Sequence, residues 1–280
     1  MGSDSNPSPG YGPATVVGVG IAGACVGIGL GFLLQKRLNV TAASSLKLLS
    51  QKGAERKFRL HVYDHCPFCI RVELVLGLRE IPYERVVYGY GDVDGPTEKF
   101  GKKMLPVLEY ENDVGVRTHL KESLDIIDYV ETLEGDLGRL LPPSTGRFSK
   151  WTKQEYKPPL RMLARPRIIN VPIGDWANPE DVEYAKQKYT KQGFDYEKAM
   201  SSTEENITKI NGALKQLEKM IYCKDYLNPW GVSMDDILLV PELRTLTCVK
   251  GVDWPPLVLA YLTCICDRAH VQLYFDYAQE

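Results

Sequence analysis

The 280-residue sequence lacks an excess of charge of either sign. It has 34 basic and 36 acidic residues, which give a formal net charge of -2. A nucleic-acid-binding surface needs clustered positive charge, so the composition offers no electrostatic argument for nucleic acid as a partner. The seven cysteines have no regular spacing, which is unlike the disulfide framework of a small secreted protein.

The sequence also lacks a second cysteine pair that would complete a zinc site. Cys66 and Cys69 form a CxxC motif, and a zinc site needs two further Cys or His ligands at suitable spacing. The other five cysteines do not repeat the motif, and the Cys264-x-Cys266 spacing is too tight for a usual zinc knuckle. We therefore expect no metal, with half of a zinc site as the alternative. The simplest role for the other five is that of small buried hydrophobic residues: Cys25, Cys223, Cys248, Cys264 and Cys266.

The CxxC motif, Cys66-Pro67-Phe68-Cys69, lies between a strand-like run at residues 58–63 and a helix-like run at residues 70–78. This position puts Cys66 at a helix N-terminus, where free backbone N–H groups and the helix dipole favour a thiolate. Pro67 suits the first helical position, and Cys69 lies one turn further on. The motif predicts a redox-active disulfide between Cys66 and Cys69, with Cys66 as the nucleophile and Cys69 as the resolving thiol.

Two residues directly before the dithiol bear on its reactivity. A protonated His65 would lower the pKa of Cys66 further, whereas Asp64 would oppose that effect. The alternative is that His65 is only a loop residue.

Residues 14–34 contain no charged side chain and are long enough to cross a hydrocarbon core of about 30 Å. A signal peptide normally has a positive segment first, but residues 1–13 form a Ser/Pro/Gly-rich tail that we expect to be disordered. Lys36 and Arg37 follow the apolar stretch. This pattern predicts a single-pass membrane anchor with the catalytic domain in the cytosol. Targeting to a mitochondrion or another organelle is the alternative, and residues 35–57 form a polar linker.

Residues 58–134 alternate between strand and helix patterns. Strand-like periodicity and turn signals predict the following order: strand 58–63, helix 67–78, strand 83–88, a short helix or turn at 96–102, a hairpin of 106–110 with 116–120, and helix 123–133. A β-α-β-α-β-β-α order with a dithiol after the first strand is typical of the thioredoxin-like fold. We therefore expect an α/β domain here.

Residues 135–149 are rich in Gly and Pro and predict a linker, and residues 150–280 show helical periodicity without a strand pattern. An amphipathic run at 202–222 follows Ser202-x-x-Glu205, which predicts a capping box. A second capping box is predicted at Ser233 and Asp236. A last helix begins at Pro255 or Pro256 and continues to Arg268. The C-terminal half is therefore expected to be all-α.

Several motifs together resemble a known family. They are Tyr63-Asp64-His65-Cys66-Pro67-Phe68-Cys69, Leu105-Pro106-Val107, Glu122-Ser123-Leu124-Asp125-Ile126, Ser233-Met234-Asp235-Asp236-Ile237 and Gly251-Val252-Asp253-Trp254-Pro255. In combination they resemble the glutaredoxin-2 type, which has a glutaredoxin active site on a two-domain glutathione-transferase fold. The resemblance covers roughly residues 58–275. The apolar stretch before residue 40 departs from the bacterial form of the family, which is soluble.

The resemblance implies a glutathione-dependent thiol–disulfide oxidoreductase that acts on disulfides or glutathionylated substrates, with glutathione as co-substrate. It implies that Pro106 is a cis-proline opposite the dithiol and that the backbone of Leu105 pairs with glutathione. It also implies that Ser123 and the helix N-terminus receive the γ-glutamyl carboxylate, while Glu122 meets the ammonium group. The plainer alternatives are a strand-entry proline and a helix-capping serine.

Three other functions compete with this interpretation. A conjugating glutathione transferase would activate glutathione with a hydroxyl group, for which Tyr63 is the candidate. A membrane-associated prostaglandin E synthase-2 type also pairs an apolar N-terminal segment with a Cys-Pro-Phe-Cys motif. A membrane-tethered binding or scaffold protein on the same fold is the non-enzymatic alternative.

Overall fold

A computed structural model describes residues 57–112, 114–133 and 139–280 of the protein. The predicted tail at 1–13, the anchor at 14–34 and all but the last residue of the predicted linker at 35–57 lie outside the described residues. Within the described ranges, no helix has the length and apolar character needed to span a bilayer.

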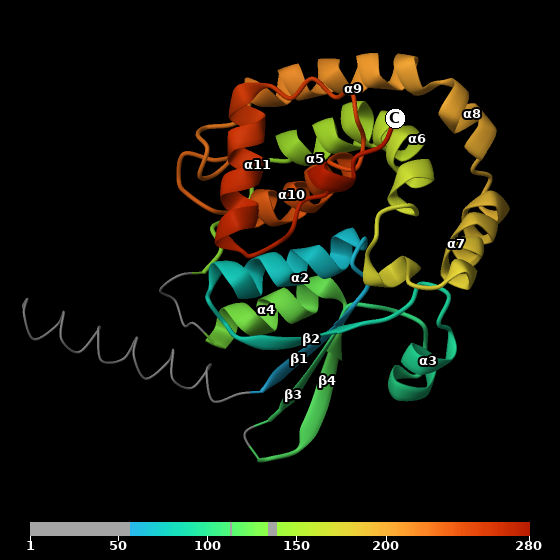
Figure 1. The fold of residues 1–280 in the computed structure, drawn as a ribbon. Coiled ribbons are helices and arrows are strands. Elements are labelled where there is room, and N and C mark those ends of the chain that lie inside the picture. The colour runs from blue at the N-terminus through green and yellow to red at the C-terminus, as the bar shows by residue number, and fades with distance from the viewer. Residues whose placement is uncertain (1–56, 113, 134–138) are drawn as a thin grey trace, which may run out of the picture. The chain divides into compact units, whose positions relative to one another are not determined.

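The first domain is built on a four-stranded sheet with the order β2-β1-β3-β4 (Figure 1). β2 is parallel to β1, and both other pairs are antiparallel, so β1 and β3 are the central strands. The chain order confirms the predicted β-α-β-α-β-β-α pattern. Its elements are β1 (Phe58–Val62), α2 (Pro67–Leu78), β2 (Tyr83–Val87), α3 (Asp94–Phe100), β3 (Val107–Glu111), β4 (Arg117–Lys121) and α4 (Ser123–Leu133).

Burial follows the position of each strand in the sheet. Four of the five residues of central β1 are buried, whereas edge strand β2 has none. α2 packs beside α4 and carries a nearly continuous buried run from Cys69 to Leu76, apart from Arg71. Such a helix needs cover on more than one side, because a surface helix would have a polar face.

The second domain supplies that cover and is helical, as predicted. α5 continues through a π-helical turn (Thr152–Tyr156) into α6, and a 3-10 turn (Gly174–Trp176) precedes α7. The helices are α5 (Arg147–Trp151), α6 (Lys157–Ile168), α7 (Pro179–Lys191), α8 (Tyr196–Ser201), α9 (Thr203–Glu218), α10 (Met234–Leu246) and α11 (Pro256–Arg268). A last 3-10 turn, Phe275–Tyr277, lies near the C-terminus.

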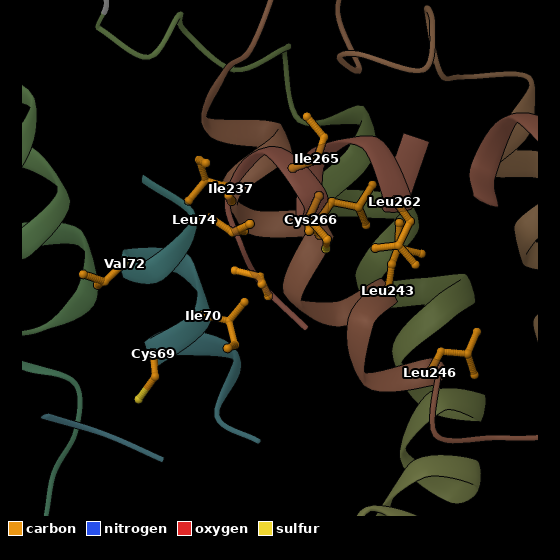
Figure 2. Close-up of a cluster of buried hydrophobic side chains, with 14 of the residues drawn as sticks. Cys69, Ile70, Val72, Leu74, Ile237, Leu243, Leu246, Leu262, Ile265 and Cys266 are labelled. Atoms are coloured by element: carbon orange, nitrogen blue, oxygen red, sulfur yellow. The ribbon is translucent and has the colours of Figure 1, made fainter. Parts of the chain in front are cut away.

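The two domains meet along α2. Figure 2 shows Ile70 and Leu74 pointing from α2 toward the side of Ile237, whereas Cys69 and Val72 point to the other side of the helix. All four α2 residues are buried. The helix that begins at the dithiol therefore belongs to the cores of both domains.

Gly77 marks the tightest approach of α2 to the helical domain. A Cβ atom added there would lie 2.1 Å from the backbone oxygen of Ala269, which is closer than any side-chain carbon can come. Because the obstacle is backbone, a small rotation of a side chain would not relieve it. Only glycine fits this position without moving α2 or the end of α11.

The predicted capping box at Ser233 is confirmed, and the one at Ser202 is wrong. Asp236 is fully buried, and its carboxylate accepts hydrogen bonds from the amides of Leu227 (2.9 Å) and Ser233 (2.8 Å). The Ser202 hydroxyl instead donates to the carbonyl of Lys198 at 2.7 Å. It does so because α8 ends directly before Ser202 and leaves its last carbonyl groups free to accept.

Candidate active site

Cys66 is the N-cap residue of α2, and Pro67 begins the helix as predicted. Cys66 is half-buried and Cys69 is fully buried, and both are free thiols in this structure. The backbone amide of Tyr63 donates to the Cys69 sulfur at 3.4 Å. The geometry thus separates an accessible thiol, Cys66, from an enclosed one, Cys69.

The two thiols differ in acidity for identifiable reasons. A hydrogen bond from Cys69, the charge of His65 and the amides of Cys69 and Phe68 lower the pKa of Cys66 to about 7, against the opposing effect of burial. Burial raises the pKa of Cys69 well above its ordinary value. Cys66 is therefore the more acidic thiol and about half ionised at neutral pH, whereas Cys69 stays protonated and donates to it.

Asp175 holds the loop that precedes the dithiol, although it comes from the helical domain. Its fully buried carboxylate accepts the amides of Asp64 at 2.6 Å and His65 at 2.7 Å, and it also contacts the Nδ1 atom of the His65 ring. The His65 ring lies against Trp176, with 4.8 Å between ring centroids. His65 is therefore an anchored residue next to Cys66, and the alternative of a plain loop residue is wrong.

The helical domain holds Asp64 from a second direction. The Asp64 carbonyl accepts hydrogen bonds from the Arg244 guanidinium at 2.9 Å and the Tyr274 hydroxyl at 3.0 Å. Its carboxylate forms an ion pair with Arg85 and accepts the amide of Gly174 at 2.8 Å. The Asp64 carboxylate is therefore paired with the Arg85 guanidinium, which reduces the opposition that this carboxylate is predicted to exert on the Cys66 thiolate.

A cleft of about 570 Å³ lies between the domains beside Cys66. Of the six predicted site residues, five line it together: Cys66, Leu105, Pro106, Glu122 and Ser123. The sixth, Cys69, is enclosed behind Cys66. The opposite wall comes from the helical domain and includes Leu160, Arg161 and Arg165 of α6 with Lys188 and Tyr189 of α7.

The Leu105–Pro106 peptide bond is cis, as the resemblance implies. Leu105 is buried and is separated from the start of β3 only by Pro106, so its backbone leads into that strand. Within the described residues, neither its N–H nor its C=O pairs with another backbone group. A backbone segment whose N–H and C=O groups are free can pair with an extended peptide.

Glu122 and Ser123 lie at the start of α4. Glu122 is exposed and has a positive φ of 65°, a left-handed conformation that is uncommon outside glycine. Ser123 is buried, and its hydroxyl has no hydrogen-bond partner within the described residues. The plainer interpretation of Ser123 as a capping serine finds no cap bond there, so its hydroxyl is available to a ligand.

The remaining described cysteines divide into two groups. Cys248 and Cys266 are fully buried, as predicted. Cys223 and Cys264 are only half-buried, and the Cys264 thiol donates to the Asp225 carboxylate at 3.3 Å, so the prediction of a buried hydrophobic role is wrong for these two. Within the described residues, no group of His, Cys, Asp or Glu side chains is arranged to hold a metal ion.

Sequence reasoning missed Asp175, Arg244 and Tyr274, because no local spacing connects them with the dithiol. It also missed Lys103, whose amine lies 3.7 Å from the Tyr184 ring centroid and lines the cleft near Leu105. Lys102 and Lys103 did offer a signal, since only Met104 separates them from the Leu105-Pro106 motif.

Fold and site together define a dithiol protein of the two-domain glutathione-transferase architecture. Residues 60–138 match the glutathione S-transferase N-terminal domain, and residues 147–278 match the glutaredoxin 2 C-terminal domain. A glutathione S-transferase of Ceriporiopsis subvermispora in complex with glutathione is 17% identical, with a TM-score of 0.59 over 77% of this chain and 98% of its own. That likeness concerns the fold alone.

Two further relatives define the family. Glutaredoxin 2 of Escherichia coli K12 is 29% identical over 219 residues, which is 77% of this chain and 97% of the relative. The crystal structure of glutaredoxin 2 from Salmonella typhimurium in complex with glutathione is 30% identical, with a TM-score of 0.73 over 79% of this chain and 99% of its own. The chain belongs to the glutaredoxin 2 family and is a glutathione oxidoreductase.

Proposed function

We propose that Cys66 and Cys69 reduce disulfides and glutathione mixed disulfides at the mouth of the cleft. The single observation that carries this proposal is the acidity of Cys66, whose pKa is lowered to about 7 while it lines the cleft. A thiol with this pKa is about half ionised at neutral pH and attacks a disulfide without a separate base.

The proposed reaction exchanges one disulfide bond for another. The Cys66 thiolate attacks the glutathionyl sulfur of a mixed disulfide, forms a Cys66–glutathione disulfide and releases the substrate as a thiolate. A second glutathione thiolate then attacks the glutathionyl sulfur, restores Cys66 and leaves as glutathione disulfide. With a protein disulfide, the buried Cys69 thiol loses its proton and displaces the substrate sulfur from Cys66.

The residues that line the cleft suit the parts of glutathione. The unpaired backbone of Leu105 offers hydrogen bonds to the cysteinyl backbone, next to Pro106. The Ser123 hydroxyl and the first amides of α4 suit the γ-glutamyl carboxylate, and the Glu122 carboxylate suits its ammonium group. Lys103 supplies a cation for the glycyl carboxylate.

The decisive test compares Cys66→Ser with Cys223→Ser in the reduction of a glutathione mixed disulfide. We expect no turnover for Cys66→Ser, because a serine hydroxyl does not ionise at neutral pH. Cys223→Ser is the matched control, since Cys223 is also half-buried but does not line the cleft. Retained turnover in Cys66→Ser would overturn the proposal.

The transferase alternative depends on the Tyr63 hydroxyl. Tyr63 is 5% exposed, and burial raises the pKa of its hydroxyl, which disfavours the phenolate. The accessible ionisable group at this end of the cleft is therefore the Cys66 thiol. Assays with a conjugation substrate and a prostaglandin endoperoxide test the transferase and isomerase alternatives, and absence of all three activities would favour the scaffold alternative.

The membrane anchor at residues 14–34 remains part of the proposal. The support comes from its charge-free sequence and the cations that follow it, which favour a cytosolic catalytic domain. Extraction of membranes at alkaline pH should leave the full chain in the pellet, and release into the supernatant would contradict the anchor. Protease added to sealed vesicles tests on which side the catalytic domain lies.

Glycosylation offers a further test of orientation. Entry of residues 38 onward into the secretory pathway would expose two acceptor motifs, at Asn39 and Asn206. Asn206 is buried, and its amide donates to the Ser202 carbonyl at 2.8 Å, so the folded domain does not offer it to an enzyme. Sugar on Asn39 would therefore be the informative result, and it would refute the cytosolic orientation.

A further inference from the structure

The cleft carries more positive than negative charge. Its lining includes five cations, Lys103, Lys157, Arg161, Arg165 and Lys188, and two carboxylates, Glu122 and Glu242. Glu242 is neutralised by Lys157, with 2.9 Å between the amine and the carboxylate oxygen. Glu122 lies at the opposite, thioredoxin-like side of the cleft. The helical side is therefore left with a surplus of positive charge.

Arg161 and Arg165 lie four residues apart on α6 and so share one face of the helix. Arg161 is exposed, and the Arg165 guanidinium lies over the rings of Tyr189 (4.5 Å) and Phe194 (5.0 Å). Within the described residues, neither arginine forms an ion pair. Like charges at this spacing weaken a helix, so local stability does not explain the pair.

Lys188 on α7 continues the same wall. Its amine donates to the Tyr90 hydroxyl at 2.9 Å and lies 4.7 Å from the centroid of that ring. No carboxylate pairs with it within the described ranges. Its charge also acts on Lys103, whose pKa burial and Lys188 lower to about 8 against the weaker influence of Asp92 and Asp181. An anion bound between these groups would relieve the repulsion.

We infer that Arg161, Arg165 and Lys188, here called the cationic wall, select disulfide substrates whose leaving half carries carboxylates. This inference rests on the proposed function, because it assigns the half of the mixed disulfide that glutathione does not occupy. The arginine forks can pair with carboxylates through two hydrogen bonds, and the aromatic rings beneath Arg165 hold its guanidinium in place.

The chemistry of the exchange adds a second reason for positive charge on this side. When Cys66 attacks the glutathionyl sulfur, the new Cys66–sulfur bond forms as the old sulfur–sulfur bond breaks. The electron pair leaves on the substrate sulfur as a thiolate. A leaving group that already carries carboxylates becomes more negative in this step. The cationic wall therefore favours both the binding of the anionic substrate and the negative charge that develops on its sulfur.

The test uses the full chain and three mixed disulfides that share the glutathione half. The other half is mercaptosuccinate, which is anionic, mercaptoethanol, which is neutral, or cysteamine, which is cationic. We expect kcat/KM to fall in that order and the preference for the anionic substrate to weaken as salt is added. In Arg161→Gln/Arg165→Gln, we expect the anionic-to-neutral ratio of kcat/KM to fall about tenfold, as for the loss of two partly exposed ion pairs.

The matched control is Lys209→Gln/Lys215→Gln, which also removes two positive charges, but from exposed positions on α9 outside the cleft. It should keep the wild-type ratio. The single variant Arg161→Gln keeps the test valid if the double variant misfolds. It should fold normally, because Arg161 is exposed and has no ion-pair partner in the described structure. We expect this variant to lower the ratio too, by a smaller factor than the double variant.

The outcomes separate this inference from the proposed function. Turnover of all three disulfides with equal kcat/KM, or an unchanged ratio in the double variant, would overturn the cationic wall and leave the proposed function standing. No turnover of any of the three would overturn the proposed function itself. Glutathionylated peptides with Asp-rich or Lys-rich flanks then distinguish the source of the carboxylates: faster reduction of the Asp-rich peptide extends the preference from small thiols to acidic protein segments.

Discussion

The carboxylate of Asp175 binds His65 twice, through the backbone amide at 2.7 Å and through the Nδ1 atom of the ring. Asp175 belongs to the helical domain, whereas His65 directly precedes the Cys66 thiol of the thioredoxin-like domain. The charge of His65 is one of the influences that lower the pKa of Cys66. One buried carboxylate therefore connects the second domain with the reactivity of the first.

Replacement of Asp175 by Asn should impair both stability and thiol acidity. Asn keeps one acceptor oxygen but presents an NH2 group to a backbone amide, and the loss of such a buried, charged acceptor should cost about 3 kcal/mol of unfolding free energy. The pKa of Cys66 should rise because His65 is no longer held beside it. Denaturant titration measures the first effect, and the pH dependence of thiolate absorbance measures the second.

Asp181→Asn is the control for that variant. Asp181 is also buried, and it caps α7 and accepts the amide of Gly91 at 2.6 Å. Loss of the cap should cost about 1 kcal/mol and leave the pKa of Cys66 unchanged. An equal change of the Cys66 pKa in both variants would mean that Asp175 acts only through general stability.

The rate of the first exchange step should follow the ionisation of Cys66. The pKa of Cys66 is about 7, so the thiolate fraction rises with pH through this value and then levels off. At pH 6, the rate constant should be about tenfold below its plateau. A single-turnover measurement with a glutathione mixed disulfide avoids the titration of free glutathione. A profile that still rises steeply at pH 9 would contradict the assigned acidity.

Removal of Cys69 should shift the pH–rate profile to higher pH. The hydrogen bond from Cys69 is the largest influence that lowers the pKa of Cys66, so Cys69→Ala should raise this pKa toward the ordinary thiol value. Turnover of glutathione mixed disulfides should persist, since a second glutathione resolves the intermediate, but reduction of protein disulfides should be lost. Cys248→Ala, at another fully buried cysteine, should leave the profile in place.

Ser123→Ala tests the proposed position of the γ-glutamyl group. The Ser123 hydroxyl is buried in the cleft wall without a partner in the described structure, so its removal leaves no protein group unsatisfied. We expect KM for glutathione to rise about tenfold, which corresponds to roughly 1.4 kcal/mol of binding. Ser149→Ala, at an exposed position on α5, is the control. An unchanged KM would exclude a contact between Ser123 and glutathione.

The two capping predictions can be compared by mutation. Asp236→Ala removes a buried carboxylate that also accepts the Tyr261 hydroxyl at 2.9 Å, and it should cost about 3 kcal/mol or more. Ser202→Ala removes a hydroxyl that donates to the end of α8 and should cost less than about 1 kcal/mol. Thermal unfolding of both variants checks the order. Equal losses would restore Ser202 as a capping residue of α9.

These cases show how far the sequence alone could lead. The element order of the first domain, the dithiol at a helix start and the Ser233 cap depend on neighbours within a few residues, so periodicity and spacing predicted them. The contact between His65 and Asp175 joins residues 110 positions apart and has no local pattern. The capping role predicted for Ser202 is wrong because the residues around it do not show that a separate helix, α8, ends directly before it.

The close contact of Gly77 with Ala269 limits how the two domains can be separated or exchanged, in evolution and in engineering. The helix that begins at Cys66 has no room to change its distance from the helical domain, because backbone meets backbone there. The thioredoxin-like domain is therefore not expected to fold independently. If the chain were truncated near residue 138, the apolar residues of α2 that pack on the helical domain would be exposed to water. Both domains should unfold in one calorimetric transition. A chimaera with a different second domain should fold only where the backbone of that domain approaches Gly77 as closely as that of Ala269 does.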